Sequence, residues 1–106
     1  MPRYMYIAQY QPEGARGVAS AGGVARRTAI EKSCADVGGR LVSFDFAFGE
    51  DDVYAITELP DHKTAAALAL AINGAGTTKV RTVVLLTPEE VDDASHLSVT
   101  YVPPGR

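Results

Sequence analysis

The sequence predicts an α+β fold in which strands and helices follow one another in the order β-α-β-β-α-β, with one short helix after the last strand. Some segments have apolar residues at every second position and others at every third or fourth, as strands and helices do. Glycine, proline and acidic residues separate these segments. The 106 residues, of which 46% are hydrophobic and 22% charged, are typical of one folded domain over residues 1–106.

The first part of the chain predicts a strand and a helix. Residues 4–10 form an aromatic and apolar run that ends at a Gln-Pro pair, as a strand would. Residues 13–23 are rich in glycine and alanine and predict a loop or a weak helical turn. Residues 24–37 predict a helix that ends at the Gly-Gly pair 38–39. Three residues of this helix share its buried face: Ile30, Cys34 and Val37.

The middle of the chain predicts a β-hairpin formed by residues 40–48 and 53–59, joined by an acidic turn. Alternation puts one set of apolar side chains on one face of the first strand: Val42, Phe44, Phe46 and Phe48. The register expected for this turn pairs opposite residues as follows: Phe48 with Val53, Phe46 with Ala55, and Phe44 with Thr57.

The last part predicts a helix, a strand and the short helix. Asp61 is the expected N-cap of a helix over residues 62–73, which the glycines at 74 and 76 end. Residues 79–86 are rich in β-branched side chains and predict a strand. A capping box starts the helix that runs to about residue 96, and its residues are Thr87, Pro88 and Glu90. Residues 98–106 are expected to be extended, because two prolines exclude a helix there.

This element order is that of a ferredoxin-like fold. Two right-handed crossovers then give a four-stranded antiparallel sheet with strand order 4-1-3-2 and both main helices on one face. The other face is also apolar, since Met5 and Ile7 oppose Tyr4 and Tyr6 whichever way the strand is turned. Exposing such a face to water forfeits hydrophobic free energy. We therefore expect a homodimer, or a higher homo-oligomer, in which two sheets stack face to face.

The stacked faces are expected to hold either a small-molecule pocket or a filled interface with Asp45 and Arg81 at its wet rim. Charged side chains are disfavoured in the core between the sheet and the helices. We therefore assign Arg81, Glu58 and the tyrosines of the first strand to the stacked face. The candidate ligand-binding residues are Tyr4, Tyr6, Asp45, Tyr54 and Arg81. Arg81 is expected either to orient a ligand carboxylate or to pair with Asp45 or Glu58.

Several segments resemble the GYD domain family, which is named for a Gly-x-Tyr-Asp turn. They are residues 48–53 (Phe-Gly-Glu-Asp-Asp-Val), 58–61, 22–27 and 80–90, and together they cover nearly the whole chain. The resemblance implies a ferredoxin-like fold of the dimeric α/β-barrel type and no secure activity. Gly49 and Asp52 match the named turn. Asp51 stands where the family usually has tyrosine and Asp45 where an aromatic residue is common, so a ligand role of that tyrosine is not expected here.

Composition and isolated motifs exclude several classes of function. The net charge of −3 argues against a nucleic-acid partner. The longest apolar run, residues 65–72, is too short to span a membrane, and the N-terminus lacks a signal-peptide pattern, so a cytoplasmic protein is expected. Cys34 is the single cysteine and is expected in the core. His62 and His96 show no metal-ligand spacing and are expected at the surface.

The acidic turn, residues 50–52, predicts either a weak cation site or a solvated hairpin in which Asp52 binds turn amides. No nucleophile–base pair or cofactor motif is present, so no catalytic residue, metal or cofactor is assigned. The sequence favours a small homo-oligomeric binding or regulatory module. The alternative is a cofactor-independent enzyme, similar to monooxygenases or isomerases of the dimeric α/β-barrel type, that uses tyrosine, aspartate and arginine side chains. A haem or metal binder is less favoured.

Overall fold

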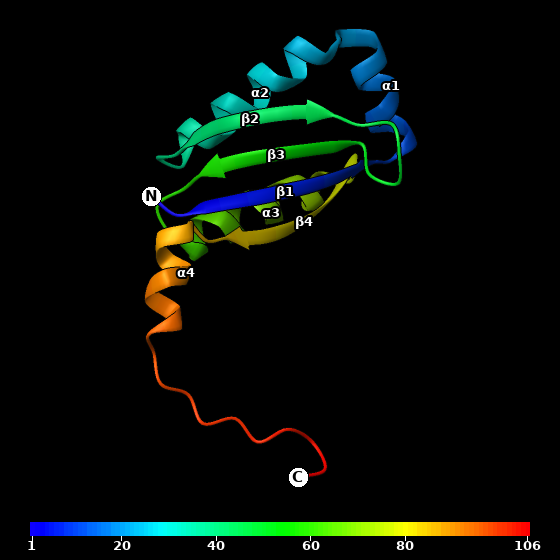
Figure 1. The fold of residues 1–106 in the computed structure, drawn as a ribbon. Helices are drawn as coiled ribbons and strands as arrows, with labels where there is room; N and C mark the ends of the chain where they lie inside the picture. Colours follow the sequence, from blue (N-terminus) through cyan, green and yellow to red (C-terminus); the bar gives the residue numbers. More distant parts are fainter.

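The computed structural model describes all residues 1–106 and contains one four-stranded antiparallel sheet. Its strands are β1 (Arg3–Tyr10), β2 (Arg40–Phe46), β3 (Val53–Glu58) and β4 (Thr78–Leu85). The order across the sheet is β2-β3-β1-β4, which confirms the ferredoxin-like topology predicted from the sequence. β2 and β4 are therefore the two edge strands (Figure 1).

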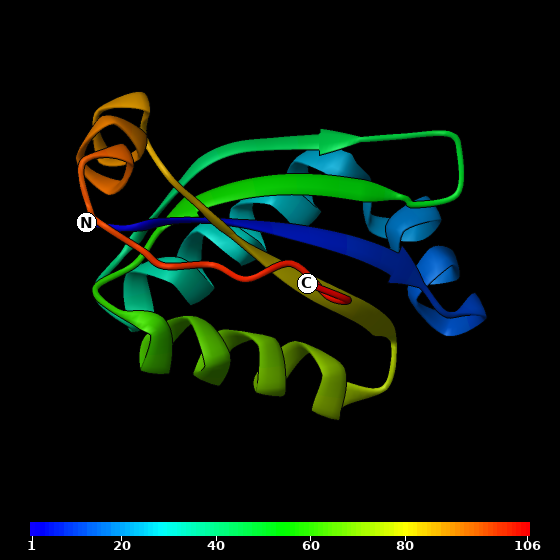
Figure 2. The same ribbon diagram turned by 60° about the horizontal axis from the view of Figure 1, so that its bottom comes forward.

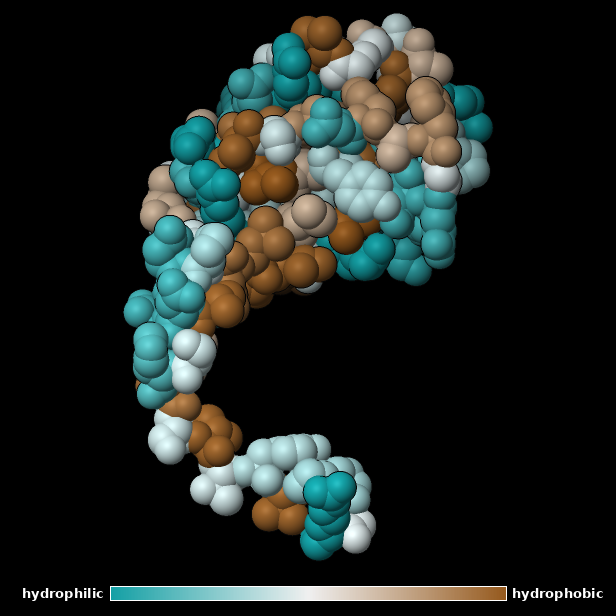
Figure 3. Space-filling view, in the orientation of Figure 1, coloured by the Kyte–Doolittle hydropathy of each residue, from teal (hydrophilic) through white to brown (hydrophobic).

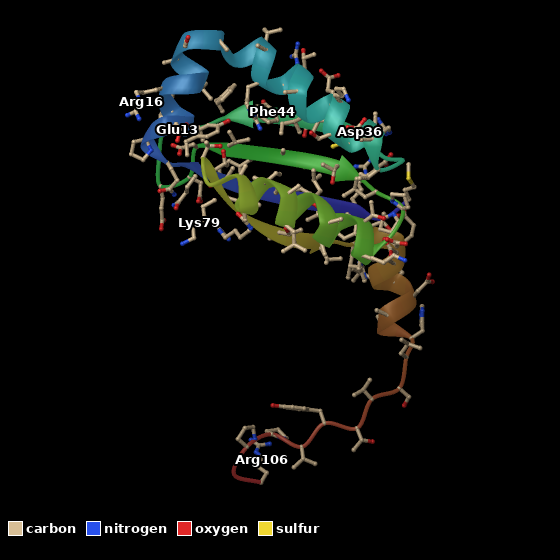
Figure 4. All side chains as sticks on the ribbon, turned by 180° about the vertical axis from the view of Figure 1, so that it is seen from behind. Glu13, Arg16, Asp36, Phe44, Lys79 and Arg106 are labelled. Atoms are coloured by element: carbon tan, nitrogen blue, oxygen red, sulfur yellow. The ribbon has the colours of Figure 1, made fainter.

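The helices are α1 (Pro12–Ala21), α2 (Gly23–Asp36), α3 (His62–Ala75) and α4 (Pro88–Ser95). Seen from behind, α2 and α3 lie side by side in front of the sheet (Figure 4). The sheet therefore has a helix-packed face and a face that no helix covers (Figures 1 and 4). None of the four helices has the length and apolar character needed to cross a membrane.

The helix-packed face holds the core. Cys34 is fully buried, as predicted from its position on the apolar face of α2. Leu59, which follows β3, is also fully buried. The remaining members of the buried apolar cluster come from β1, β3 and α3: Tyr4, Tyr6, Ala8, Val53, Ala55, Ala65 and Leu68. This cluster packs the helices onto one face of the sheet. No helix packs on the opposite face.

Local capping agrees with the sequence. The Asp61 side chain accepts a hydrogen bond from the Thr64 N–H at the start of α3. Thr87 and Glu90 form the predicted reciprocal capping box at the start of α4. Gly38 ends α2 and Gly76 ends α3, each with a positive φ that favours glycine.

The prediction of a loop or weak turn at residues 13–23 was wrong, because most of this segment is α1. Pro12 stands in the first turn of α1, where the missing N–H is no loss. Gly14 lowers the helix propensity but is required by packing, since a Cβ there would collide with the backbone carbonyl of Thr77. The same carbonyl accepts a hydrogen bond of 2.9 Å from the Gln11 N–H, so α1 is held against the turn that precedes β4.

The predicted hairpin register was wrong by two residues. Val53 pairs with Phe46 rather than with Phe48, and Ala55 pairs with Phe44. β2 ends at Phe46, which leaves Phe48 fully exposed in a longer loop. A register shift between Leu41 and Ser43 bulges β2 near its start and breaks the strict alternation expected there.

Candidate functional site

The uncovered face of the sheet is the candidate site, and we call it the open face. Cross-strand register determines its members, because paired residues project to the same side of a sheet. Its centre is formed by Met5, Ile56 and Val83, and Ile7, Tyr54 and Leu85 continue it toward its two ends. Apolar atoms continue across this face toward the start of α4 (Figure 3).

A row of polar side chains crosses one end of the open face. The register pairs Asp45 with Tyr54, Tyr54 with Ile7, and Ile7 with Arg81. Three of the five predicted ligand-binding residues, Asp45, Tyr54 and Arg81, therefore lie on the same face and in the same row across four strands. Only Ile7, which is buried, interrupts the row.

The prediction that Tyr4 and Tyr6 share this face was wrong. Both belong to the core on the helix-packed face, where Tyr4 is 1% and Tyr6 4% exposed. The Tyr6 hydroxyl donates a hydrogen bond of 2.7 Å to the Ala65 carbonyl of α3. The Tyr4 hydroxyl lies 2.6 Å from Nδ1 of His62, which keeps a buried phenol paired and gives this exposed histidine a structural contact.

Asp51 joins the row from the loop between β2 and β3. Its carboxylate Oδ2 accepts a hydrogen bond from the Tyr54 hydroxyl at 3.2 Å and lies 3.3 Å from Nη2 of Arg81. The Asp51 side chain is only 9% exposed, whereas that of Arg81 is 65% exposed. Arg81 thus pairs with neither Asp45 nor Glu58, the two partners considered from the sequence, and most of its guanidinium stays accessible.

Backbone contacts fold the acidic loop onto β1 and so position Asp51. The Asp52 N–H donates to the Ala8 carbonyl at 2.8 Å, and the Asp52 side chain accepts from the Tyr10 N–H at 2.8 Å. Gln9 donates from its side chain to the Glu50 carbonyl at 3.0 Å. Asp52 therefore binds a strand amide rather than the turn amides that the sequence suggested. No three His, Cys, Asp or Glu side chains converge in a way that could hold a metal ion.

The surroundings of Tyr54 disfavour ionisation of its phenol. The hydrogen bond to Asp51, together with burial, raises the pKa of the Tyr54 phenol. Near neutral pH the phenol is neutral, and its single O–H is donated to Asp51 beside the Arg81 cation. A hollow of about 340 Å³ lies at this end of the face and includes Ile7, Asp51, Lys79 and Arg81 in its lining.

The opposite end of the open face is closed by an ion-pair cluster. Glu58 lies between two arginines, 2.7 Å from Nε of Arg40 and 3.2 Å from Nε of Arg3. These two bonds lower the pKa of the Glu58 carboxyl. Glu58 partly neutralises both arginines, whereas Arg81 borders the hollow and keeps 65% of its side chain exposed, so Arg81 is the cation best placed for a ligand there.

Sequence reasoning considered Asp51 only as part of a weak cation site in the acidic turn and not as a partner of Arg81. The residue lies in a loop, and neither periodicity nor spacing indicates that the loop folds back over β1. The signal that did mark this position was the resemblance to the GYD turn, in which Asp51 replaces the usual tyrosine. The replacement puts a carboxylate against Tyr54 and Arg81.

The fold and the open face define the class of protein: a ferredoxin-like α+β domain with helices on one face of its sheet and an uncovered apolar face with a polar cluster on the other. The family model of the GYD domain matches residues 4–95, and the chain belongs to the GYD domain family. No curated protein and no solved structure matches the chain significantly.

The buried Tyr6 phenol makes alkaline stability a test of the core. Burial raises its pKa to about 12, from an ordinary value of 10.0. Because the folded-state value is the higher one, the stabilisation by Tyr6 is complete below about pH 10 and is lost as the pH rises toward about 12. We expect Tyr6→Phe to lower the free energy of unfolding by about 1 kcal/mol at neutral pH and to reduce its fall at alkaline pH. Urea unfolding at about pH 8 and about pH 11 measures both effects.

Equal alkaline losses in wild type and Tyr6→Phe would contradict the assignment of the effect to Tyr6.

Proposed function

We propose that this domain is a homodimeric binding module that encloses a small organic acid between two open faces. The observation that carries the proposal is the pairing, on one uncovered surface, of an apolar centre with the accessible Arg81 guanidinium. An apolar wall with a few polar groups is the usual composition of a small-molecule site. The two-fold partner supplies the second wall that a single copy lacks.

The polar row gives each group a part in binding. Arg81 would pair with the carboxylate of the ligand, because one of its nitrogens contacts Asp51 and the others remain available. Asp51 holds the guanidinium in place and Tyr54 supports Asp51 through its hydroxyl. The apolar body of the ligand would lie along Met5, Ile56 and Val83.

Arg81→Gln tests this site with anilinonaphthalene sulfonate, a fluorescent probe that has an aromatic body and an anionic head. We expect the variant to bind the probe about tenfold more weakly, because it loses a charge-assisted hydrogen bond. The oligomer should persist, as measured by sedimentation velocity. Probe titration followed by fluorescence gives the affinity.

Arg16→Gln is the matched control. Arg16 is exposed on α1, away from the open face, and the same change of charge there should leave probe affinity unaltered (Figure 4). Equal affinity of Arg81→Gln and wild type would remove Arg81 from the site and overturn the proposed ligand class.

A further inference from the structure

The C-terminal arm, residues 97–102, has the sequence pattern of a strand but no sheet to join. Its residues Leu-Ser-Val-Thr-Tyr-Val alternate apolar and polar side chains up to Tyr101 and are rich in β-branched and aromatic types. Leu97, Val99 and Tyr101 fall on one side, and each is more than 70% exposed. No backbone N–H of residues 98–102 donates a hydrogen bond within the chain. The two prolines at 103 and 104 end the pattern.

The arm stands away from its own body. α4 leaves the end of β4 on the side of the sheet opposite α3, and the arm continues beyond the β4 edge (Figures 1 and 2). Every residue from Leu86 to Val102 is exposed. This is the side on which a second copy would stack, so the arm reaches toward that copy.

The sheet offers one regular free edge for such a strand. The β2 edge is bulged between Leu41 and Ser43 and is packed by α2, and a bulge hinders strand addition. The β4 edge pairs with β1 over eight consecutive residues without a bulge. The Asn73 side chain binds the outer N–H and carbonyl of Val80, at 2.7 and 3.3 Å. The outer backbone groups of Thr82 and Val84, further along the same edge, have no partner within the chain and can accept another strand.

An apolar groove of about 450 Å³ accompanies this edge on its helix-packed side. It lies between α3 and β4, and its lining includes Ala66, Ala69, Leu70 and Val84. Leu70 is 72% and Val84 52% exposed, so the groove has no apolar occupant from its own chain. Three apolar side chains on one side of an added strand would fill it.

We propose that the arm of one protomer adds to the β4 edge of the second copy as a fifth strand, with Leu97, Val99 and Tyr101 in the groove between β4 and α3. The inference rests on the homodimer of the proposed function and adds a reciprocal exchange of arms to it. It explains why an alternating apolar strand is presented to solvent and why the β4 edge is unprotected beyond the Asn73–Val80 contact. The contact is between copies because α4 directs the arm away from its own groove.

Tyr101→Trp tests the proposal, since the chain contains no other tryptophan. At concentrations where sedimentation velocity shows the dimer, the indole should emit at shorter wavelength and be quenched severalfold less by acrylamide than in the matched Thr100→Trp variant. Dilution to monomer should abolish the difference. Adding Leu70→Asp to Tyr101→Trp should expose the indole at any concentration, because it places a carboxylate in the groove.

Two results would overturn the arm exchange while leaving the homodimer intact. The first is that acrylamide quenches the indole at position 101 in the dimer as strongly as it quenches the indole at position 100. The other is an indole that stays shielded after dilution to monomer, which would place the arm on its own β4 edge. A chain that remains monomeric at all concentrations would overturn both the proposed function and the exchange.

Discussion

Val83→Asp is expected to convert the proposed homodimer into a folded monomer. Val83 lies at the centre of the open face and is 38% exposed in a single copy, so an aspartate there can be hydrated while the chain is alone. In the stacked dimer the carboxylate would be buried in an apolar surface, and the partner would bring a second one. Burial of unpaired charge should weaken association by at least about 100-fold. Sedimentation velocity over a range of concentrations measures the change.

Val24→Asp is the matched control for this result. Val24 is 68% exposed on α2, away from the open face, so the same substitution there should leave association unchanged. Circular dichroism should show that both variants keep the wild-type secondary structure. A Val83→Asp variant that dimerises like the wild type would remove the open face from the interface.

Leu59→Ala is expected to lower the free energy of unfolding by about 3 kcal/mol, the largest effect on stability proposed for a single side chain. Leu59 is fully buried where the chain leaves β3 toward α3, and it packs so closely against Gly39 that a Cβ at Gly39 would collide with it. Truncation leaves a cavity that this rigid backbone cannot close. Chemical denaturation of the variant, followed by circular dichroism, gives the value.

The exposed Val24→Ala change serves as the control and should alter stability by less than about 0.5 kcal/mol. A loss of similar size in both variants would mean that Leu59 is not a core residue.

The strand order followed from the order of the elements and the handedness of their crossovers. The starts of α3 and α4 could be predicted because they depend on short-range chemistry. The Thr87 capping box and the Asp61 N-cap need only a hydroxyl or carboxylate a fixed number of residues before an amide. The buried side of α2 followed from the spacing of Ile30 and Cys34. Each of these local features is contained in a few consecutive residues.

The faces of the sheet were harder to predict because tyrosine suits either one. The ring of Tyr6 fills the core while its hydroxyl reaches the Ala65 carbonyl, so its polarity gives no sign of the face it occupies. The hairpin register failed for a related reason. Both candidate pairings of Val53, with Phe46 or with Phe48, put a phenylalanine opposite it, and the loop length that decides between them depends on contacts with β1.

The site was half predictable. Arg81, Tyr54 and Asp45 were recognised as polar side chains in otherwise apolar strands. Asp51 contacts Tyr54 and Arg81 only because Gln9 and Ala8 hold the loop across the end of β1, which is a tertiary arrangement. Long-range contacts of this kind leave no period in the sequence.

The contact between α1 and the turn before β4 joins the two crossover units of the fold at one backbone oxygen. The Thr77 carbonyl accepts a hydrogen bond from the Gln11 N–H, and it lies so close to position 14 that only glycine fits there. Separating the N-terminal and C-terminal halves must break this junction together with the β1–β4 ladder. The two halves are therefore mechanically coupled. The same contact anchors the start of β4, the edge strand to which we propose that the arm of a second copy adds.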